Sequence, residues 1–192
     1  FVPRRQSGMT TRKTSTSASQ TSTSPTSAPV TLAAIDMGSN SFRLELARIV
    51  QGRYQRQLYL KETVRLGGGL DDDGVLGEAA MRRGLECLAR FAVHLKGMDA
   101  RNVRAVATQT MREARNRDAF LARAREALAH EIEVISGREE ARLIYAGVSH
   151  LQPGSGPRLV FVIGGRSTEM ILGTGHVPRV GESFAVGSVG LS

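Results

Sequence analysis

The chain has 192 residues, 41% hydrophobic content and a formal net charge of +8. No apolar run approaches the roughly 20 residues that a membrane helix needs, so we expect no membrane span. The positive charge favours polyanionic partners, but aromatic residues are only 5% of the chain and tryptophan is absent, which argues against a module that stacks nucleic-acid bases. We therefore expect a phosphate-rich small molecule or polymer as partner, and no specific nucleic acid.

Residues 1–30 are dominated by Ser, Thr, Pro and Ala, and they contain basic residues but no acid. Such a composition cannot bury enough apolar surface to order itself, so we predict a disordered tail. A targeting sequence is the alternative, but no amphipathic face supports it. The single cysteine, Cys87, cannot form an internal disulfide, which favours a reducing compartment and a cytoplasmic location.

The first structured stretch, residues 31–47, predicts a strand, a tight polar loop and an antiparallel return strand. Asp36 lies at the carboxyl end of the first strand. The loop that follows presents backbone N–H groups and two hydroxyls, which suit a phosphate, from Gly38, Ser39, Asn40 and Ser41. Asp36 beside it suits a hard cation bridging that phosphate. The alternative is an ordinary hairpin turn.

The pattern then predicts a third strand at residues 54–64, a glycine-rich loop at 65–77 and an amphipathic helix at 78–95 that ends before Gly97. Cys87 falls within this helix, and we expect it to be a small buried residue rather than a catalytic thiol. The three acids at 71–73 lack the spacing of a calcium loop, so we assign no metal there.

A short buried strand at 103–107 is followed directly by Thr108, Thr110 and Arg112. Open α/β sheets bind ligands at this end of their strands, and Arg112 is a candidate for bidentate phosphate binding. A surface arginine at the start of a helix is the alternative.

The next elements are a helix at 118–130, a strand at 132–135, a helix at 138–147 and a linker at 150–157. Alternating strands and helices imply parallel pairing and an α/β fold. Glu139 and Glu140 lie in the first turn of the last helix, where acids stabilise the helix dipole. One of them could instead point into a cleft as a general base.

Residues 158–173 repeat the strand–loop–strand arrangement of residues 31–47. The second loop and the acid that follows it comprise Gly164, Gly165, Arg166, Ser167, Thr168 and Glu169. Two such loops are readily explained as half-sites that face one phosphate chain across a cleft. The chain ends after a further strand-like segment, so we expect a first lobe at residues 31–150 and the beginning of a truncated second lobe at 151–192.

Five motifs in this order resemble the Ppx/GppA exopolyphosphatase and guanosine pentaphosphatase family. They are IDMGSNSFRL at 35–44, VRLGGGL at 64–70, ATQTMREARN at 107–116, IEVISGREEARLIYAGV at 132–148 and IGGRSTEM at 163–170. The resemblance implies an actin-like α/β ATPase fold, related to hexokinase, Hsp70 and ribonuclease H, with two duplicated lobes.

The resemblance also implies Mg²⁺-assisted release of terminal orthophosphate from inorganic polyphosphate or from the guanosine polyphosphate pppGpp. In that family pattern Glu140 matches the general base that activates water, and Arg112 matches a phosphate-binding arginine. The loops at 38–41 and 164–168 match two phosphate loops, and Asp36 and Glu169 match acids near the metal. A homodimer through parts beyond residue 192 is a further possibility.

One position departs from the family pattern. Val162 stands where the family has an aspartate just before Ile-Gly-Gly. A valine cannot hold a cation or its water, and the loss of one oxygen ligand weakens a metal–phosphate site. The alternative function is therefore a binding module that retains the phosphate loops and hydrolyses little.

Overall fold

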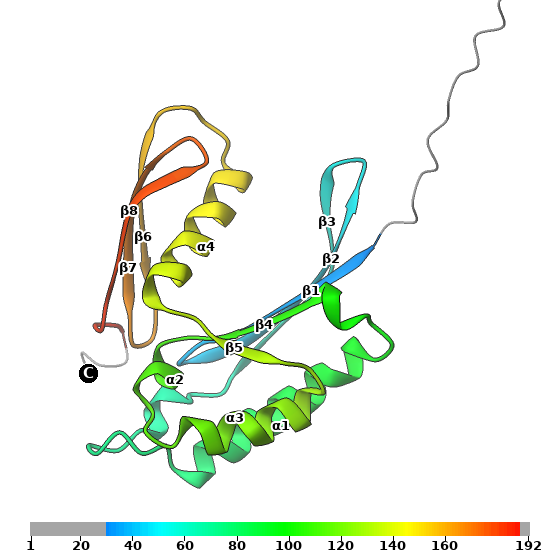
Figure 1. Cartoon of the computed structure of the whole chain (residues 1–192), viewed down its shortest axis with the longest axis vertical. Helices are drawn as coiled ribbons and strands as arrows, with labels where there is room; N and C mark the ends of the chain where they lie inside the picture. Colours follow the sequence, from blue (N-terminus) through cyan, green and yellow to red (C-terminus); the bar gives the residue numbers. More distant parts are fainter. Residues whose placement is uncertain (1–29, 189–192) are drawn as a thin grey trace, which may run out of the picture.

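The computed structural model describes residues 30–188. The predicted tail therefore lies outside the described residues, apart from Val30. Two β-sheets and four α-helices make up the described part (Figure 1). The first sheet contains β1 (Thr31–Met37), β2 (Ser41–Val50), β3 (Arg53–Thr63), β4 (Val103–Ala107) and β5 (Ile132–Val134). The second contains β6 (Pro157–Ile163), β7 (Thr168–Thr174) and β8 (Val177–Phe184). The helices are α1 (Glu78–Leu95), α2 (Gln109–Glu113), α3 (Arg117–Leu128) and α4 (Gly137–Leu151), with 3₁₀ turns at Gly67–Gly69 and Ala100–Asn102.

The first sheet has the strand order β3-β2-β1-β4-β5. β1, β2 and β3 form an antiparallel meander, whereas β1, β4 and β5 are parallel. Both patterns confirm the α/β prediction. The parallel arrangement brings the carboxyl ends of β1, β4 and β5 to one edge of the sheet, where the polar segments that follow them can meet.

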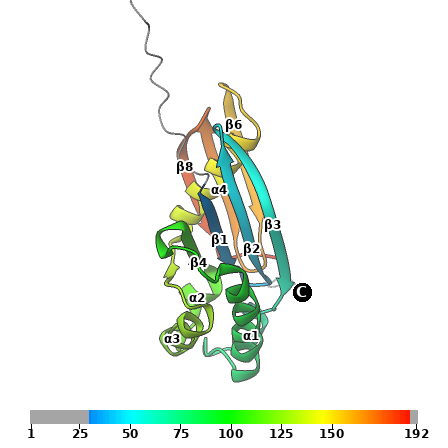
Figure 2. The same cartoon turned by 90° about the vertical axis from the view of Figure 1, so that its right-hand side faces the viewer.

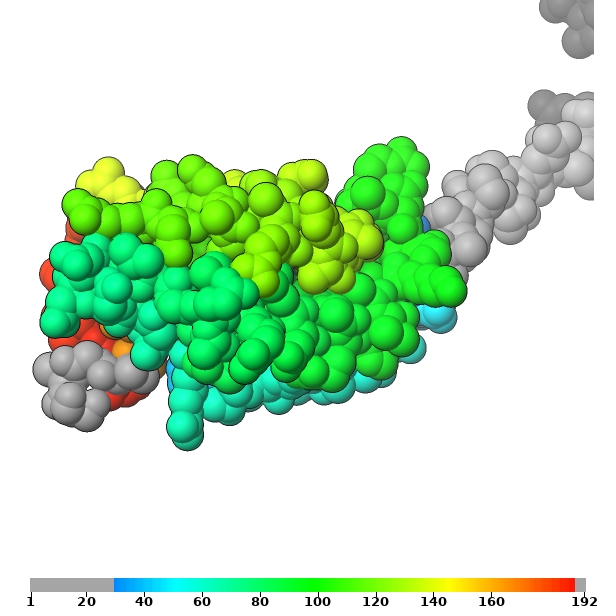
Figure 3. Space-filling model, turned by 90° about the horizontal axis from the view of Figure 1, so that it is seen from below, coloured from blue at the N-terminus to red at the C-terminus, as the bar shows by residue number. Residues whose placement is uncertain are grey.

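The main hydrophobic core lies between this sheet and helices α1 and α3 (Figure 2). Phe42 of β2, Phe91 of α1 and Phe120 of α3 are fully buried in it. Gly84 lets the two helices approach, because a Cβ at this position would lie 3.1 Å from the Phe120 ring. Cys87 is fully buried in the same core, which confirms the prediction of a packing role. From below, α1 and α3 form the outer layer of the molecule (Figure 3).

Helix α4 packs mainly against the second sheet. Its Ala141 and Tyr145 form a second, smaller core with Val160 of β6 and Ile171 of β7. Figure 1 shows the helix in the angle between the two sheets. The sequence predicted this helix in the first lobe because it precedes the Gly- and Pro-rich linker. Because α4 packs with the second sheet, the boundary between the two packing units lies between β5 and α4, before the predicted linker.

Two predicted helix boundaries also differ from the structure. α4 continues to Leu151 instead of ending at Gly147, so the predicted linker begins inside the helix. Gly147 has open space around it, and an exposed glycine within a helix costs only about 1 kcal/mol. α3 ends at Leu128 because Ala129 adopts a left-handed conformation, with φ of 59°. None of the helices within residues 30–188 is both long and apolar enough to cross a membrane.

Candidate functional site

A cavity of about 470 Å³ lies between the two sheets, at the edge where β1, β4 and β5 end. Ser39 from the β1–β2 loop, Ser167 from the β6–β7 loop and Glu140 from α4 all line it. The two loops and the helix tip that the sequence analysis singled out therefore border one cavity. This is the spatial relationship that a two-sided phosphate site requires.

The first of the two predicted phosphate loops, between β1 and β2, is held in place by the glycine-rich segment that follows β3. The carbonyl of Asn40 accepts hydrogen bonds from the N–H groups of Val64 and Arg65, at 3.0 and 2.8 Å, and the carbonyl of Ser39 accepts one from Gly67 at 2.8 Å. The VRLGGGL motif thus supports the loop through its backbone. The hydroxyl of Ser39 is also fixed, because it accepts a hydrogen bond from Thr110 Oγ1 at 2.8 Å.

The second predicted phosphate loop, between β6 and β7, closes with a hydrogen bond from the Gly164 N–H to the Ser167 carbonyl at 2.8 Å. Gly165 lies against the first loop, since a Cβ on it would come within 3.2 Å of the Asn40 Cβ. A side chain here would push the two loops apart. The loops therefore touch each other at one end of the cavity.

Charged side chains from the first sheet form one wall of the cavity. Asp36 of β1, Arg43 of β2 and Lys61 of β3 are directly paired across the strands. Paired residues share a face of a sheet, so these side chains form a row that borders the cavity. The predicted acid is thus accompanied by two cations that the sequence analysis did not identify.

Asp36 forms an ion pair with Arg43, with 2.6 Å between the Asp36 Oδ2 and the Arg43 Nη1. Burial raises the pKa of the Asp36 carboxyl, while the hydrogen bond and the charge of Arg43 oppose the rise. Lys61 makes no ion pair among the residues that the structure describes. Its ammonium group is therefore available to an anion in the cavity.

The opposite wall comes from the second sheet, where Val162, Glu169 and Ser183 are directly paired on β6, β7 and β8. The side chain of Glu169 is almost completely buried, with 1% of the residue exposed. Its Oε1 accepts a hydrogen bond from Ser183 Oγ at 3.0 Å, and no Lys or Arg within residues 30–188 pairs with it. A buried carboxylate without a cationic partner is costly, which suits a site for a cation.

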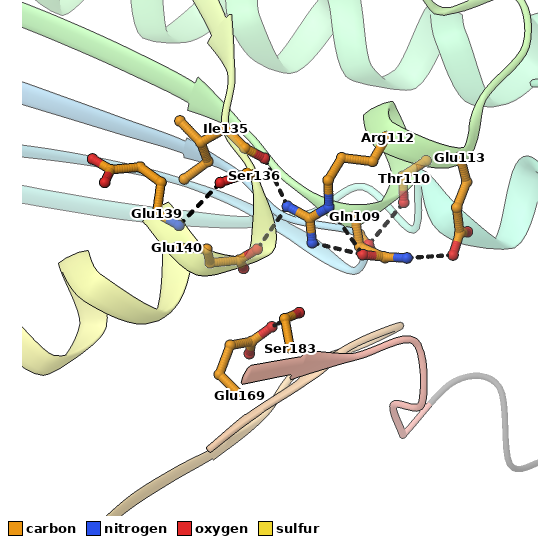
Figure 4. A network of polar contacts seen from close by, with 11 residues as sticks. Gln109, Thr110, Arg112, Glu113, Ile135, Ser136, Glu139, Glu140, Glu169 and Ser183 are labelled. Atoms are coloured by element: carbon orange, nitrogen blue, oxygen red, sulfur yellow. Dashed lines mark hydrogen bonds and ion pairs between the residues drawn. The ribbon is translucent and has the colours of Figure 1, made fainter. Parts of the chain in front are cut away.

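Glu140 enters the cavity from the first turn of α4. Ser136 caps this helix, and its Oγ accepts a hydrogen bond from the Glu139 N–H at 3.2 Å. Arg112 Nη1 donates to Glu140 Oε2 at 2.9 Å (Figure 4). Burial, followed by the negative charge of Glu169, raises the pKa of Glu140, and Arg112 opposes the rise. A carboxylate with a raised pKa inside a cavity is a candidate general base.

The neighbouring acid in the motif has a different environment. Glu139 pairs with Arg142 at 2.7 Å and does not line the cavity. The hydrogen bond from Arg142 lowers the pKa of Glu139 to about 2. Of the two candidates that the sequence offered, the structure therefore directs Glu140 into the cavity and turns Glu139 away.

Three predicted phosphate-binding residues lie outside the cavity walls. Arg112 is occupied by Glu140, by the Ile135 carbonyl and by a glutamine of its own helix. Arg166 pairs with a glutamate of α2, and Thr168 Oγ1 donates to a backbone carbonyl at 2.7 Å. The other predicted residues do line the cavity: Asp36, Gly38, Ser39, Asn40, Ser41, Glu140, Gly164, Gly165, Ser167 and Glu169.

Arg43 and Lys61 line the cavity although the sequence pattern gave no sign of it. Thr108 also lines the cavity, at the strand end where a ligand was expected. Arg43 lies between the buried Phe42 and Leu44, and Lys61 follows the partly buried Leu60, which is the pattern of the opposite sheet face. Alternation alone could not show that this face borders a cavity, because the sheets come together only in the tertiary structure.

The residues present are compatible with Mg²⁺, which prefers oxygen ligands and commonly keeps several waters. Asp36 and Glu169 supply carboxylates on opposite walls of the cavity. Within residues 30–188, however, no three acidic, histidine or cysteine side chains gather closely enough to form a complete metal site. An ion here would therefore need oxygen atoms from water and from a bound phosphate.

Fold and site together define an α/β protein in which a polar loop from each of two sheets borders one carboxylate-containing cavity. Residues 46–192 match the model of the Ppx/GppA phosphatase family. This chain belongs to the Ppx/GppA phosphatase family.

Named relatives agree with this assignment. The chain is 49% identical over 158 residues to a Haemophilus influenzae protein provisionally named as an exopolyphosphatase, covering 82% of this chain and 49% of that protein. It is 48% identical over 157 residues to a guanosine-5'-triphosphate,3'-diphosphate pyrophosphatase of Vibrio vulnificus, covering 82% of this chain and 32% of that protein.

Solved structures confirm the expected fold. An exopolyphosphatase from Cytophaga hutchinsonii superposes with a TM-score of 0.78 at 32% identity, over 84% of this chain and 52% of that one. The Ppx/GppA enzyme of Aquifex aeolicus gives a TM-score of 0.76 at 31% identity, over 85% of this chain and 55% of that one. The chain therefore spans about one third to one half of the length of these proteins.

Proposed function

We propose that the full protein containing this chain releases terminal orthophosphate from inorganic polyphosphate or from pppGpp. The observation that carries the proposal is the convergence of Ser39, Ser167 and Glu140 on one cavity. The names of the relatives, exopolyphosphatase and guanosine-5'-triphosphate,3'-diphosphate pyrophosphatase, supply the two substrate classes. Both substrates contain a terminal phosphoanhydride, so one site can serve either.

The terminal phosphate would lie between the two loops. Small residues and hydroxyl groups in both loops allow the backbone to approach phosphate oxygens closely. Arg43 and Lys61 on the first-sheet wall would neutralise the next phosphate groups along the substrate. In this arrangement the two loops would bind the phosphate that reacts, and Arg43 and Lys61 would bind the remaining phosphates of the substrate.

Glu140 would accept a proton from water as the water oxygen attacks the terminal phosphorus. The bond to the bridging oxygen breaks, and the shortened phosphate chain leaves with the electron pair of that bond. Arg112, which does not line the cavity, donates a hydrogen bond to the Glu140 carboxylate and would hold it in position. Phosphoryl transfer depends on positioning and on electrostatic stabilisation more than on covalent chemistry, and these residues are placed to supply both.

We propose that Mg²⁺ binds between Asp36 and Glu169 when substrate is present. A bound Mg²⁺ would neutralise charge that develops on the phosphate oxygens. The support is the buried carboxylate of Glu169, which has no cationic partner in the described part of the chain.

A second candidate function is binding with little hydrolysis. Val162, on the cavity wall beside Glu169, provides no oxygen where the family pattern has a carboxylate. A protein with intact loops and a weakened metal site would bind polyphosphate or guanosine polyphosphate as a sensor. For either function we propose a cytoplasmic location. The formation of a homodimer by the full protein stays a prediction.

One experiment separates the two functions. The full-length protein is incubated with polyphosphate and with pppGpp, with and without Mg²⁺, and released orthophosphate is measured alongside binding. If the protein hydrolyses these substrates, the wild type should release orthophosphate and the Glu140→Gln variant should not. Tight binding without release, in the wild type as well as the variant, would favour the sensor instead.

A further inference from the structure

Helix α2 carries a continuous series of polar contacts from Glu140 to the second phosphate loop. Arg112 donates to Glu140 Oε2 at 2.9 Å, and its Nε and Nη2 donate to Gln109 Oε1 at 3.0 and 2.6 Å. Gln109 Nε2 in turn donates to Glu113 Oε1 at 2.6 Å. Arg166 donates to Glu113 Oε2 at 2.8 Å. We call these five side chains the α2 network.

The chemistry of the side chains fixes the direction of the contacts. A guanidinium only donates hydrogen bonds, and a carboxylate only accepts them. The Gln109 amide lies between the Arg112 guanidinium and the Glu113 carboxylate, so its oxygen must face Arg112 and its nitrogen must face Glu113. In the reverse orientation both contacts would be lost. Glu113 therefore holds Gln109 in the one orientation that also positions Arg112.

The network is mostly shielded from water. The side chains of Arg112 and Glu140 are 20% and 17% exposed, and those of Glu113 and Arg166 are 28% and 30% exposed. Gln109 is placed three residues before Arg112 and four before Glu113, so the three side chains share one side of the short helix. Partly buried charge-assisted hydrogen bonds of this kind are stronger than exposed ones.

Arg166 connects this network to the other sheet. It belongs to the β6–β7 loop, yet its partners are Glu113 of α2 and the Gly67 carbonyl, at 3.4 Å from Nη1. Gly67 provides the space for this crossing, because a Cβ there would lie 2.5 Å from Arg166 Cδ. Glu113 thus keeps its full set of partners only while the second loop lies against the first.

We infer that Gln109, Glu113 and Arg166 are positioning residues that orient Glu140 when the two phosphate loops are in contact. The inference rests on the proposed function, in which Glu140 activates water. Displacement of the second loop would remove Arg166 from Glu113, free the Gln109 amide to rotate and loosen Arg112. Small misplacements of a catalytic group cost large factors in rate, so the network couples loop contact to hydrolysis.

The first test measures phosphate release by Gln109→Leu, which removes both amide contacts at similar size, and by Arg166→Met. Each variant should lower kcat about 10- to 100-fold with KM changed less than about threefold, as for other residues that orient a reacting group. Arg166→Lys should recover part of the loss, because it keeps the charge near Glu113. The matched control is Arg142→Met, which removes the partner of Glu139 and should leave kcat unchanged.

A second test does not depend on activity. A double-mutant cycle in unfolding free energy joins Glu113→Ala with Glu140→Ala, two side chains with no direct contact. If the α2 network couples these two side chains, their effects on stability should not be independent. The change in the unfolding equilibrium constant of the double variant should then differ by more than about twofold from the product of the changes in the two single variants. In the control cycle, the effects of Glu113→Ala and Glu139→Ala on the unfolding free energy should be additive.

Wild-type kcat in both Gln109→Leu and Arg166→Met, or losses confined to KM, would overturn the inference, as would additivity in the Glu113–Glu140 cycle. If the wild-type protein releases no phosphate, the proposed function fails, and the unfolding cycle alone decides whether the coupling exists.

Discussion

Val162 lies directly opposite Glu169 in the β6–β7 ladder, and both side chains line the cavity. Val162 also packs against the apolar core formed by α4 and the second sheet. The position that carries an oxygen ligand in the family pattern is thus a hydrophobic contact in this chain. The neighbouring Glu169 is left as the buried acid of this wall.

This relationship predicts that Val162→Asp makes the protein more responsive to Mg²⁺. Without metal the new carboxylate lies beside Glu169, and the repulsion should lower the melting temperature. A bound cation relieves that repulsion, so Mg²⁺ should raise the melting temperature of Val162→Asp more than that of the wild type. Thermal unfolding with and without Mg²⁺ measures the difference. Val162→Asn, which adds a polar group without charge, is the control, and an equal Mg²⁺ response in all three proteins would contradict the proposed metal position.

We predict that Glu140→Gln lowers the rate of phosphate release by about 10²- to 10⁴-fold, the usual contribution of a general base. Substrate affinity should change little, because the loops and the cavity cations remain. The measurement is orthophosphate release together with equilibrium binding of polyphosphate. Glu139→Gln is the matched control, since Glu139 faces Arg142 outside the cavity. Similar losses in both variants would indicate that the helix tip has a structural role only.

Glu140 should also leave a signature in the pH dependence of stability. Burial and Glu169 raise the pKa of Glu140 above its ordinary value of 4.5 in the folded protein. The folded state then binds a proton more tightly than the unfolded state, so this contribution to stability is present below pH 4.5 and is lost as pH rises through the raised pKa. Chemical denaturation across this range should show a smaller decline for Glu140→Gln than for the wild type. Identical profiles would mean that the pKa is not raised.

Lys61→Gln should weaken substrate binding without altering the chemical step. Lys61 lines the cavity and has no carboxylate partner within the described residues, so its charge is available to the substrate. We expect KM for polyphosphate to rise about 5- to 20-fold at low salt, and less at high salt, because screening weakens the contact. Steady-state kinetics at two ionic strengths test this. Lys96→Gln removes the same charge at the end of α1, away from the cavity, and should behave as the wild type.

Cys87 should be unreactive in the folded protein. Its side chain is fully buried, and burial together with the charge of Glu62 raises the pKa of the thiol to about 12. Since the thiolate is the reactive form, labelling by a disulfide reagent should occur only after denaturation. Rapid labelling under native conditions would show that the α1 core opens readily.

The sequence by itself determined the α/β class, the two strand–loop–strand units and half of the residues that line the cavity. These features follow from local patterns: apolar periodicity, small polar loops and an acid placed in a helix's first turn. Cys87 was also predicted correctly, because its position in the helical repeat placed it in the core.

Only the tertiary structure decided which side chains meet. The local pattern could not choose between Glu139 and Glu140, because both suit a helix N-terminus. The family resemblance pointed to Glu140, and the physical reason for that choice is how α4 lies between the sheets. Nor could it show that Arg112 binds Glu140 and that Arg166 crosses to α2, since both contacts join segments far apart in the chain. Arg43 and Lys61 became candidates only when two sheets closed around one cavity. Periodicity sets which face a residue occupies, but packing sets what that face meets.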